Sequence, residues 1–135
     1  TLGNTAVYLG NTTTTLGNLT FTGSTVNNPT VTNYTESVVA IGNSGTAQTL
    51  ALTNGTFQTV TMTGNCTFTM PTAAAGKSFV LIVYSGAGGF TGTFTSVKWS
   101  GGSAPTLTST ASKYDLLSFF SDGTSWFGIS QLNFS

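Results

Sequence analysis

Charged side chains are almost absent from this chain of 135 residues. It has three lysines, no arginine, no histidine and three acidic residues, so that 4% of the sequence is charged, where an ordinary soluble protein has about 25%. Three lysines at zero net charge cannot form the basic groove by which proteins displace counterions from nucleic acid. We therefore expect no nucleic acid among the partners of this protein.

The lack of histidine excludes several kinds of active site. A Ser-His-Asp triad, a Cys-His pair and a His-ligated metal site all need that side chain. The acids are Glu36, Asp115 and Asp122, too few for an Asp-rich calcium loop.

Glycoside hydrolysis needs two carboxyl groups about 5 to 9.5 Å apart. Asp122 precedes Gly123 and is better explained as a turn residue, whereas Asp115 fits the start of a strand, where Lys113 could pair with it. We therefore expect no catalysis within one chain, no metal and no cofactor. A catalytic site shared between subunits is the alternative that the sequence leaves open.

Cysteines and long apolar runs are scarce too. The single Cys66 has no partner for an internal disulfide, and we expect it to be a buried small residue rather than a nucleophile. The longest apolar run, residues 79–84, is far shorter than the roughly 20 residues that span a bilayer. We expect no membrane insertion. The chain begins with Thr1 rather than Met, and we expect it to be part of a longer protein.

Small hydroxylated and amidic residues fill most of the chain instead. It contains 29 threonines, 17 glycines, 15 serines and 10 asparagines, together with 39% hydrophobic and 12% aromatic residues. Disordered chains have low hydrophobicity and high net charge, which this chain does not. Threonine, valine and phenylalanine pack well on a pleated surface. The composition predicts an all-β protein.

Residues 1–35 carry an internal repeat. Leu-Gly-Asn begins at Leu2, Leu9 and Leu16, seven residues apart, with a partial echo at Ile41. Glycine and asparagine tolerate the positive φ that a turn or bulge in each repeat needs. The repeat predicts a short repetitive β stem, with a flexible linker as the alternative. Because a few short strands are marginal alone, we expect the stem to pair with copies of itself in a symmetric homo-oligomer.

Residues 36–135 show the pattern of a globular β domain. Five apolar residues occupy even positions between threonines, which predicts one apolar and one hydroxyl face: Val60, Met62, Cys66, Phe68 and Met70. A three-residue loop at 63–65 would keep these side chains on one face of a hairpin, with Met62 opposite Cys66 and Val60 opposite Phe68. Asn54-Gly55 predicts another hairpin.

Two further segments indicate the centre of the domain. The run 79–84 is apolar at consecutive positions, which predicts a central strand covered on both faces. Asp122-Gly123 predicts a two-residue hairpin turn that places Phe119 opposite Trp126 and Leu116 opposite Ile129. Strands separated by Gly, Pro and Asn turns indicate a β-sandwich. We predict an antiparallel, jelly-roll-like sandwich over residues 36–135.

Four blocks of this domain resemble one known kind of domain. They are 53–71 (including Val60-Thr61-Met62-Thr63-Gly64-Asn65-Cys66-Thr67-Phe68-Thr69-Met70-Pro71), 76–81, 97–107 and 115–128. In this order they resemble a domain at the C-terminal end of bacteriophage tail-fibre and related virion proteins, often from marine phages. The final residues 132–135 fit the end of that pattern, which implies a native C-terminus. Cys66 and Ser100 depart from it mildly. The stem looks like the repetitive shafts that precede such tips.

The resemblance implies a virion appendage outside the cell, assembled as a homotrimer, whose distal tip adsorbs to a polysaccharide or protein on the host surface. A missing N-terminal region would join it to other virion proteins. Two alternatives stay open from the sequence: a purely structural or decorative virion fibre, such as a head fibre or spacer, and a secreted bacterial adhesin. The almost uncharged, threonine-rich surface suits any exposed structural protein, because little of its stability depends on ion pairs that salt screens.

Loops are the expected place for a receptor site, because they vary without disturbing the sandwich. The candidate loops are 86–90, 100–105 and 122–125. The candidate receptor-binding residues in or beside them are Phe90, Trp99, Ser103, Tyr114, Asp122 and Ser125. Trp99 and Trp126 could stack on sugar rings, but their alternation with core residues favours packing.

Overall fold

The structure, a computed structural model, describes residues 20–135. The chain divides into two compact units, 1–34 and 35–135. Residues 20–34 form no helix or strand, and all of their side chains are exposed. The repeat at Leu2, Leu9 and Leu16 lies outside the described residues, so the β stem stays a prediction.

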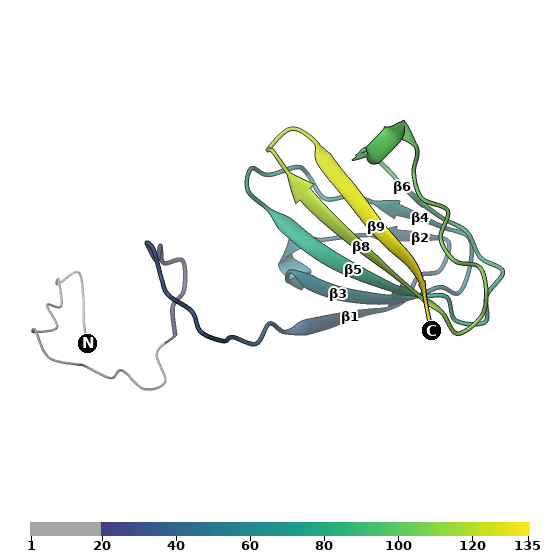
Figure 1. The fold of residues 1–135 in the computed structure, drawn as a ribbon, viewed down its shortest axis with the longest axis horizontal. Coiled ribbons are helices and arrows are strands. Elements are labelled where there is room, and N and C mark those ends of the chain that lie inside the picture. The colour runs from purple at the N-terminus through teal and green to yellow at the C-terminus, as the bar shows by residue number, and fades with distance from the viewer. Residues whose placement is uncertain (1–19) are drawn as a thin grey trace, which may run out of the picture. The chain divides into compact units, whose positions relative to one another are not determined.

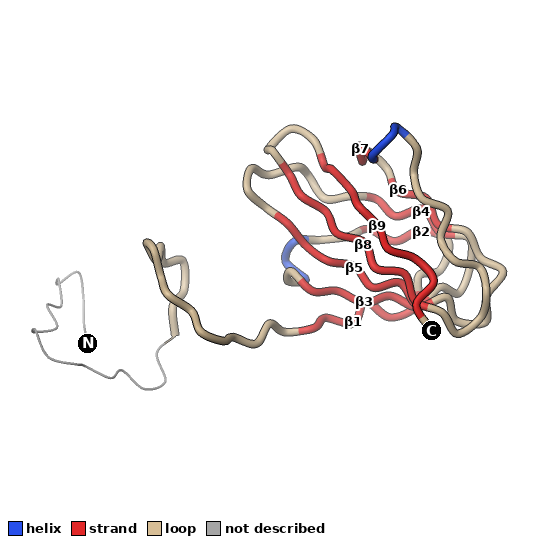
Figure 2. Tube along the Cα trace, in the orientation of Figure 1, coloured by secondary structure: helices blue, strands red, loops and turns tan. Residues whose placement is uncertain are grey.

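The second unit is built almost entirely of strands, which confirms the all-β prediction (Figure 2). Its strands are β1 (Val38–Asn43), β2 (Ala47–Thr49), β3 (Phe57–Thr61), β4 (Cys66–Thr69), β5 (Ser78–Tyr84), β6 (Gly92–Phe94), β7 (Val97–Trp99), β8 (Tyr114–Ser121) and β9 (Trp126–Phe134). Two 3₁₀ turns, η1 (Leu52–Asn54) and η2 (Ser100–Gly102), complete the elements of the described residues.

These strands form two sheets that face each other across one core (Figure 1). Sheet A has the order β1-β3-β5-β8-β9-β7, and sheet B has the order β2-β4-β6. Strands β1 to β6 belong alternately to sheet A and sheet B. Each connection therefore crosses from one sheet to the other, and successive strands of the same sheet run in the same direction.

The predicted antiparallel arrangement is consequently wrong for much of the domain. Sheet B is parallel, and in sheet A the pairs β1–β3, β3–β5 and β7–β9 are parallel, whereas β5–β8 and β8–β9 are antiparallel. The described strands do not confirm the predicted jelly roll, because a jelly roll is built of antiparallel sheets whereas sheet B is parallel and sheet A is mixed.

The hairpin predicted around Gly64-Asn65 is also wrong. Strand β3 pairs with β1 and β5, while β4 pairs with β2 and β6, so Val60 and Phe68 face each other from opposite sheets instead of lying on neighbouring strands. Alternation placed both side chains on the core side, and both are buried. A hairpin and a crossover between facing sheets satisfy the same alternation, which is why the pattern could not distinguish them.

The segment Asn54-Gly55 turns the chain without forming a hairpin. It ends η1, and Gly55 has a φ of 89°, in the region that glycine tolerates best. The fully buried Gln58 stabilises this connection, because its Nε2 donates to Ala51 O at 3.0 Å and to Gly55 O at 2.9 Å.

The β8–β9 hairpin is confirmed, but its register differs from the prediction. Ser121 pairs with Trp126, and Phe119 pairs with Gly128 instead of Trp126. The loop therefore has four residues, 122–125, in place of two. The Asp122 carboxylate accounts for the difference, because its Oδ1 accepts from Thr124 N at 2.8 Å and from Ser125 N at 2.7 Å, closing a longer loop than Asp-Gly alone requires.

The core lies between the two sheets and contains every even-numbered residue predicted for it. Its buried members are Leu50, Val60, Met62, Cys66, Phe68, Met70, Phe79, Leu81, Val83, Leu107, Leu117, Phe119 and Trp126. Trp126 is 2% exposed and its Nε1 donates to Pro71 O at 2.7 Å, which satisfies the polar end of a buried indole. Burial raises the pKa of the Cys66 thiol, consistent with the expected inert residue.

Candidate receptor-binding surface

The sandwich has two ends with different loops. Ser78 pairs with Phe120, and Tyr84 pairs with Tyr114. The loop 122–125 that follows β8 therefore lies at one end, called here the hairpin end, where β1 also begins. The loop 85–91 that follows β5 lies at the opposite end, called here the glycine-loop end. The candidate loops 86–90 and 122–125 are thus separated by the length of the sheet.

Ser85 connects the two chain segments of the glycine-loop end. It is buried, its Oγ donates to Thr110 O at 2.7 Å, and the same Oγ accepts from Lys113 N at 2.9 Å. Ser85 N donates to Lys113 O at 2.8 Å. One serine thereby holds the loop after β5 against the segment that leads into β8.

The glycines of this end allow a close backbone approach. Gly89 N donates to Ser109 O at 2.7 Å, and Ser112 N donates to Gly86 O at 3.0 Å. At Gly88, where φ is 78°, an added Cβ would lie 2.5 Å from Ser109 O, closer than real contacts allow. The loops at this end are therefore fixed in position before any ligand arrives, which lowers the entropic cost of binding.

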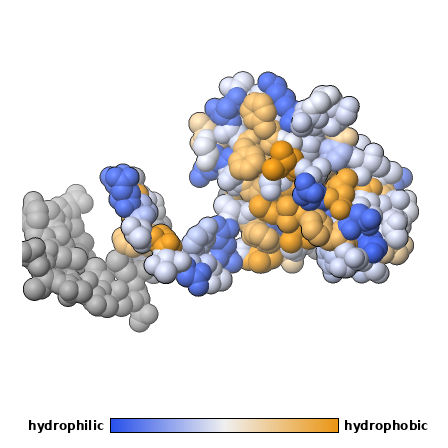
Figure 3. Space-filling model, in the orientation of Figure 1, coloured by the Kyte–Doolittle hydropathy of each residue, from blue (hydrophilic) through white to orange (hydrophobic). Residues whose placement is uncertain are grey.

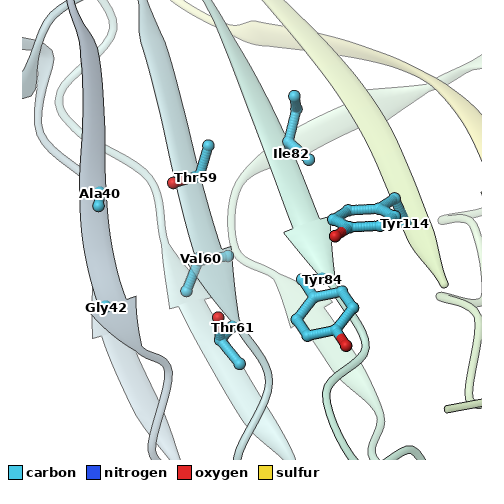
Figure 4. Close-up of a pocket in the computed structure, with 8 residues that line it drawn as sticks. All are labelled: Ala40, Gly42, Thr59, Val60, Thr61, Ile82, Tyr84 and Tyr114. Atoms are coloured by element: carbon cyan, nitrogen blue, oxygen red, sulfur yellow. The ribbon is translucent and has the colours of Figure 1, made fainter. Parts of the chain in front are cut away.

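Two tyrosines stand at the margin of the glycine-loop end (Figure 4). The rings of Tyr84 and Tyr114 lie 4.7 Å apart between centroids at an angle of 32°, and Tyr84 Oη donates to Ser112 Oγ at 3.4 Å. They line a hollow of about 300 Å³, the tyrosine hollow, with Ala40, Gly42, Thr59, Val60, Thr61 and Ile82. Tyr114 is 45% exposed. The hollow thus offers aromatic faces and hydroxyl groups without a charge.

Phe90 belongs to the same end but is half-buried against the core. The next residue, Thr91, is bound to a residue outside this loop, because Thr91 N donates to Asn65 Oδ1 at 2.9 Å. Phe90 and Tyr114 are the two predicted receptor residues that the structure brings to one end of the sandwich.

Trp99 and Ser103 lie elsewhere, beside the exposed edge of β9. They line a second hollow, of about 410 Å³, together with Ser100, Pro105, Gly128, Ile129, Ser130 and Gln131. The Trp99 ring makes edge contacts with Phe94 at 5.7 Å and Phe119 at 5.9 Å. An added Cβ at Gly128 would lie 2.5 Å from it. Trp99 therefore packs on the core with one side and borders the hollow with the other.

Asp122 and Ser125, the remaining predicted site residues, form the hairpin end. The backbone N–H groups of Ser125 and Thr124 lower the pKa of the Asp122 carboxyl by donating to it. Both predicted residues are thus occupied in closing the turn.

Asp115 has a structural role that the sequence did not reveal. It is 2% exposed, and its carboxylate accepts from Thr108 N and Thr108 Oγ1, each at 2.6 Å, and from Asn133 N at 2.9 Å. Asn133 has a φ of 64° where the β8–β9 register shifts. The predicted pairing of Asp115 with Lys113 is not what the structure shows. The available signal was parity, because Asp115 shares the inward positions of Leu117 and Phe119.

Glu36, the third acid, lies at the hairpin end and accepts a hydrogen bond from the Thr56 hydroxyl. It lines a third hollow with Thr56, Phe57, Ser78, Phe79, Val80, Ser118 and Phe120. Within residues 20–135, no group of three or more His, Cys, Asp or Glu side chains is placed to hold a metal ion. In the same part of the chain, no helix has the length and apolarity to cross a membrane.

The outer face of sheet A is unexpectedly apolar (Figure 3). All large hydrophobic residues that are exposed in the second unit lie on three strands of this sheet: Val38, Tyr114, Phe120, Phe127, Ile129, Leu132 and Phe134. The consecutive apolar residues of the run 79–84 had predicted a strand covered on both faces. The structure covers one face with the core and leaves Val80, Ile82 and Tyr84 partly exposed on the other.

No protein-family model matches this chain, and neither a curated protein nor a solved structure matches it.

Proposed function

We propose that the chain is the distal part of a virion fibre, a phage tail fibre, which acts as a homotrimer and attaches without catalysis to a polysaccharide or protein on the host surface. Its attachment surface is the glycine-loop end. Other virion proteins join it through a region N-terminal to residue 1. This role places the protein outside the cell, on the virion.

One observation carries the proposal. The glycine-loop end holds two segments rigidly together through Ser85 and presents aromatic and hydroxyl groups beside them at Tyr84, Tyr114 and Ser112. Flat apolar sugar faces stack on aromatic rings, and sugar hydroxyls need hydrogen-bond partners at fixed positions. A fixed, uncharged surface of this kind suits a surface glycan.

The acids support a role without catalysis. Asp115 is bound to Thr108 and Asn133, Asp122 closes the hairpin loop, and Glu36 accepts from Thr56. Each carboxylate has a structural partner, and Asp115 is buried. Hydrolysis of a glycosidic bond needs two carboxyl groups on either side of the bond, whereas these carboxylates accept hydrogen bonds from their own chain, which supports attachment without catalysis.

Three exposed substitutions test which surface attaches to the host. Ala87→Arg blocks the glycine-loop end, Ser103→Arg the hollow beside Trp99, and Thr124→Arg the hairpin end; all three side chains are exposed. Binding of the labelled full chain to host cells and to their purified surface polysaccharide is measured for each. We expect Ala87→Arg to lose binding at least tenfold and the other two to keep it. Wild-type protein that binds neither cells nor polysaccharide would contradict adhesion and favour the purely structural fibre.

A further inference from the structure

We propose that the outer face of sheet A is the surface through which copies of this chain assemble, head to tail in a closed ring, with Lys98 of one copy against Glu36 of the next. The inference rests on the self-assembly part of the proposed function. The proposed contact uses the rows of this face from the hairpin end to Leu116 and leaves the terminal row, Tyr84 with Tyr114, to the glycine-loop end.

The outward side chains of sheet A form rows that cross the strands. One row runs through Val38, Phe57, Val80, Ser118 and Ile129, as the pairings between neighbouring strands show. The next row contains Ala40, Thr59, Ile82, Leu116 and Gln131. Neither row contains a charged residue. Both rows are mainly apolar, with Thr59, Ser118 and Gln131 among them, and large exposed apolar patches are typical of interaction surfaces.

The row at the hairpin end carries charge at both of its edges and none between. Ser78 pairs with Phe120, Phe120 with Phe127, and Phe127 with Lys98 on the edge strand β7. The Lys98 ammonium lies 5.6 Å from the centroid of the Phe127 ring, and Asp122 in the adjacent hairpin loop interacts with it electrostatically, so Lys98 would be shared between Asp122 and the Glu36 of the next copy. At the opposite edge, Glu36 stands two residues before Val38, so alternation puts it on the same face, and it lines a hollow with Ser78 and Phe120.

A base at one edge and an acid at the other fit a cyclic assembly. In a ring, the β7 edge of one copy meets the β1 edge of its neighbour at the same height along the strands, and every copy uses both edges once. Such head-to-tail contacts close only if the rotation between copies completes a circle. Within one chain the pair cannot meet, because five strand spacings separate β1 from β7, roughly 24 Å.

The width of the face favours three copies. Three faces roughly 25 Å wide, joined as a triangle, place each sheet roughly 7 Å from the axis, a gap that phenylalanine, leucine and isoleucine side chains can fill. Four faces would leave roughly 12 Å on each side of the axis, which side chains cannot fill. A flat face of this size has an area of roughly 500 Å². The side chains that project from it increase the area that can be buried, toward the value of about 800 Å² per partner that is usual for stable interfaces.

Charge reversal in the full-length chain tests the contact. Sedimentation velocity in low-salt buffer compares the wild type with Glu36→Lys, Lys98→Glu and the double variant. Lys113→Glu is the matched control, because Lys113 is a lysine at the other end of the sheet, before β8. We expect a wild-type species of three 13.8 kDa chains. Each single reversal should weaken association about tenfold, the double reversal should restore it, and the control should leave it unchanged.

Phe120→Asp tests the apolar face, and Thr69→Asp, on the outer face of sheet B, is its control. Circular dichroism checks folding, and Phe120→Ser with Phe127→Ser replaces Phe120→Asp if the aspartate disturbs it. Loss of the trimer in Phe120→Asp alone supports the proposal.

Four results would overturn it: a wild-type monomer or dimer, a double reversal no better than the single ones, a trimer that survives Phe120→Asp and its replacement, or equal loss with Thr69→Asp. Dissociation by Phe120→Asp without rescue by the double reversal would keep the apolar face as the interface and contradict the contact between Lys98 and Glu36. A wild-type trimer that binds no host cell leaves this interface standing and contradicts adhesion.

Discussion

The two outer faces of the sandwich differ although they cover the same core. On sheet B the outward residues of the strands are Ala47, Thr49, Thr67, Thr69 and Thr93, all exposed. On sheet A the outward positions carry valine, isoleucine, leucine, phenylalanine and tyrosine, interspersed with Thr59, Thr61, Ser78 and Ser118. Both faces are almost free of charge, so charge does not distinguish them. The outward side chains of sheet B are mostly threonine, whereas large apolar side chains predominate on sheet A, and this difference supports the proposal that sheet A contacts another protein surface.

The largest expected effect is on the free energy of unfolding and concerns Asp115, a buried residue of β8 in sheet A. Asp115→Ala leaves Thr108 and Asn133 without the acceptor that their three hydrogen bonds share. Losing a buried carboxylate that is bound in this way costs about 3–5 kcal/mol. Urea unfolding should show this loss, with Asp115→Asn between it and the wild type. Thr69→Ala, on sheet B, should change the free energy of unfolding by less than about 0.5 kcal/mol. A similar loss for both would remove the special role of Asp115.

The next largest effect is expected from substitutions that exchange apolar and threonine side chains between the outer faces of the two sheets. Val80→Thr with Ile129→Thr makes sheet A resemble sheet B. Association should weaken at least tenfold, because burying one such side chain contributes about 1.5–3 kcal/mol. Thr67→Ile with Thr69→Ile does the reverse and should produce new association or aggregation through sheet B. Light scattering against protein concentration measures both. If the threonine variant associates as the wild type does, the faces do not differ in function.

Cysteine labelling gives a smaller effect and maps the two faces directly. Ile129→Cys should react with a thiol reagent quickly in dilute solution and about tenfold more slowly at concentrations where the chain assembles. Thr69→Cys should react equally fast at both. The native Cys66 stays as an internal reference, because it is buried and burial raises its pKa; it should react only after unfolding. Protection of Thr69→Cys on assembly would place the contact on sheet B instead.

The amino-acid pattern predicted which side chains face the core far better than it predicted strand partners. Val60 and Phe68 are both buried as expected, yet they belong to different sheets. The alternation of apolar and polar residues shows which side chains point toward the core, but it does not show which strand lies next to which. The β8–β9 pair was predicted because its turn is local, and its register was missed because the Asp122 carboxylate extends the loop.

The sequence predicted individual residues of the candidate site, but it did not predict which of them lie at the same end of the sandwich. Phe90 and Tyr114 lie at the glycine-loop end, whereas Ser125 lies at the hairpin end. Which loops share an end depends on the order and direction of strands that are distant in sequence. Asp115 was missed because Thr108 lies in an irregular segment before β8 and Asn133 meets it only at the β8–β9 bulge. The apolar outer face did have a signal, since the run 79–84 is apolar at outward positions as well.

The smallest expected effect lies at the hairpin loop, beside the Lys98 edge of sheet A. Backbone N–H groups of Ser125 and Thr124 lower the folded-state pKa of Asp122. The carboxylate therefore contributes stability above its unfolded pKa of about 3.9 and loses it as the pH falls through the lower folded value. Between pH about 5 and about 2, the urea midpoint of Asp122→Asn should fall less than that of the wild type. The two proteins differ only at residue 122, so the difference isolates Asp122. Because the asparagine amide oxygen still accepts both hydrogen bonds, the trimer should survive at neutral pH. An equal fall in both proteins would show that the loop is closed by its backbone alone and that the four-residue register does not depend on the charge.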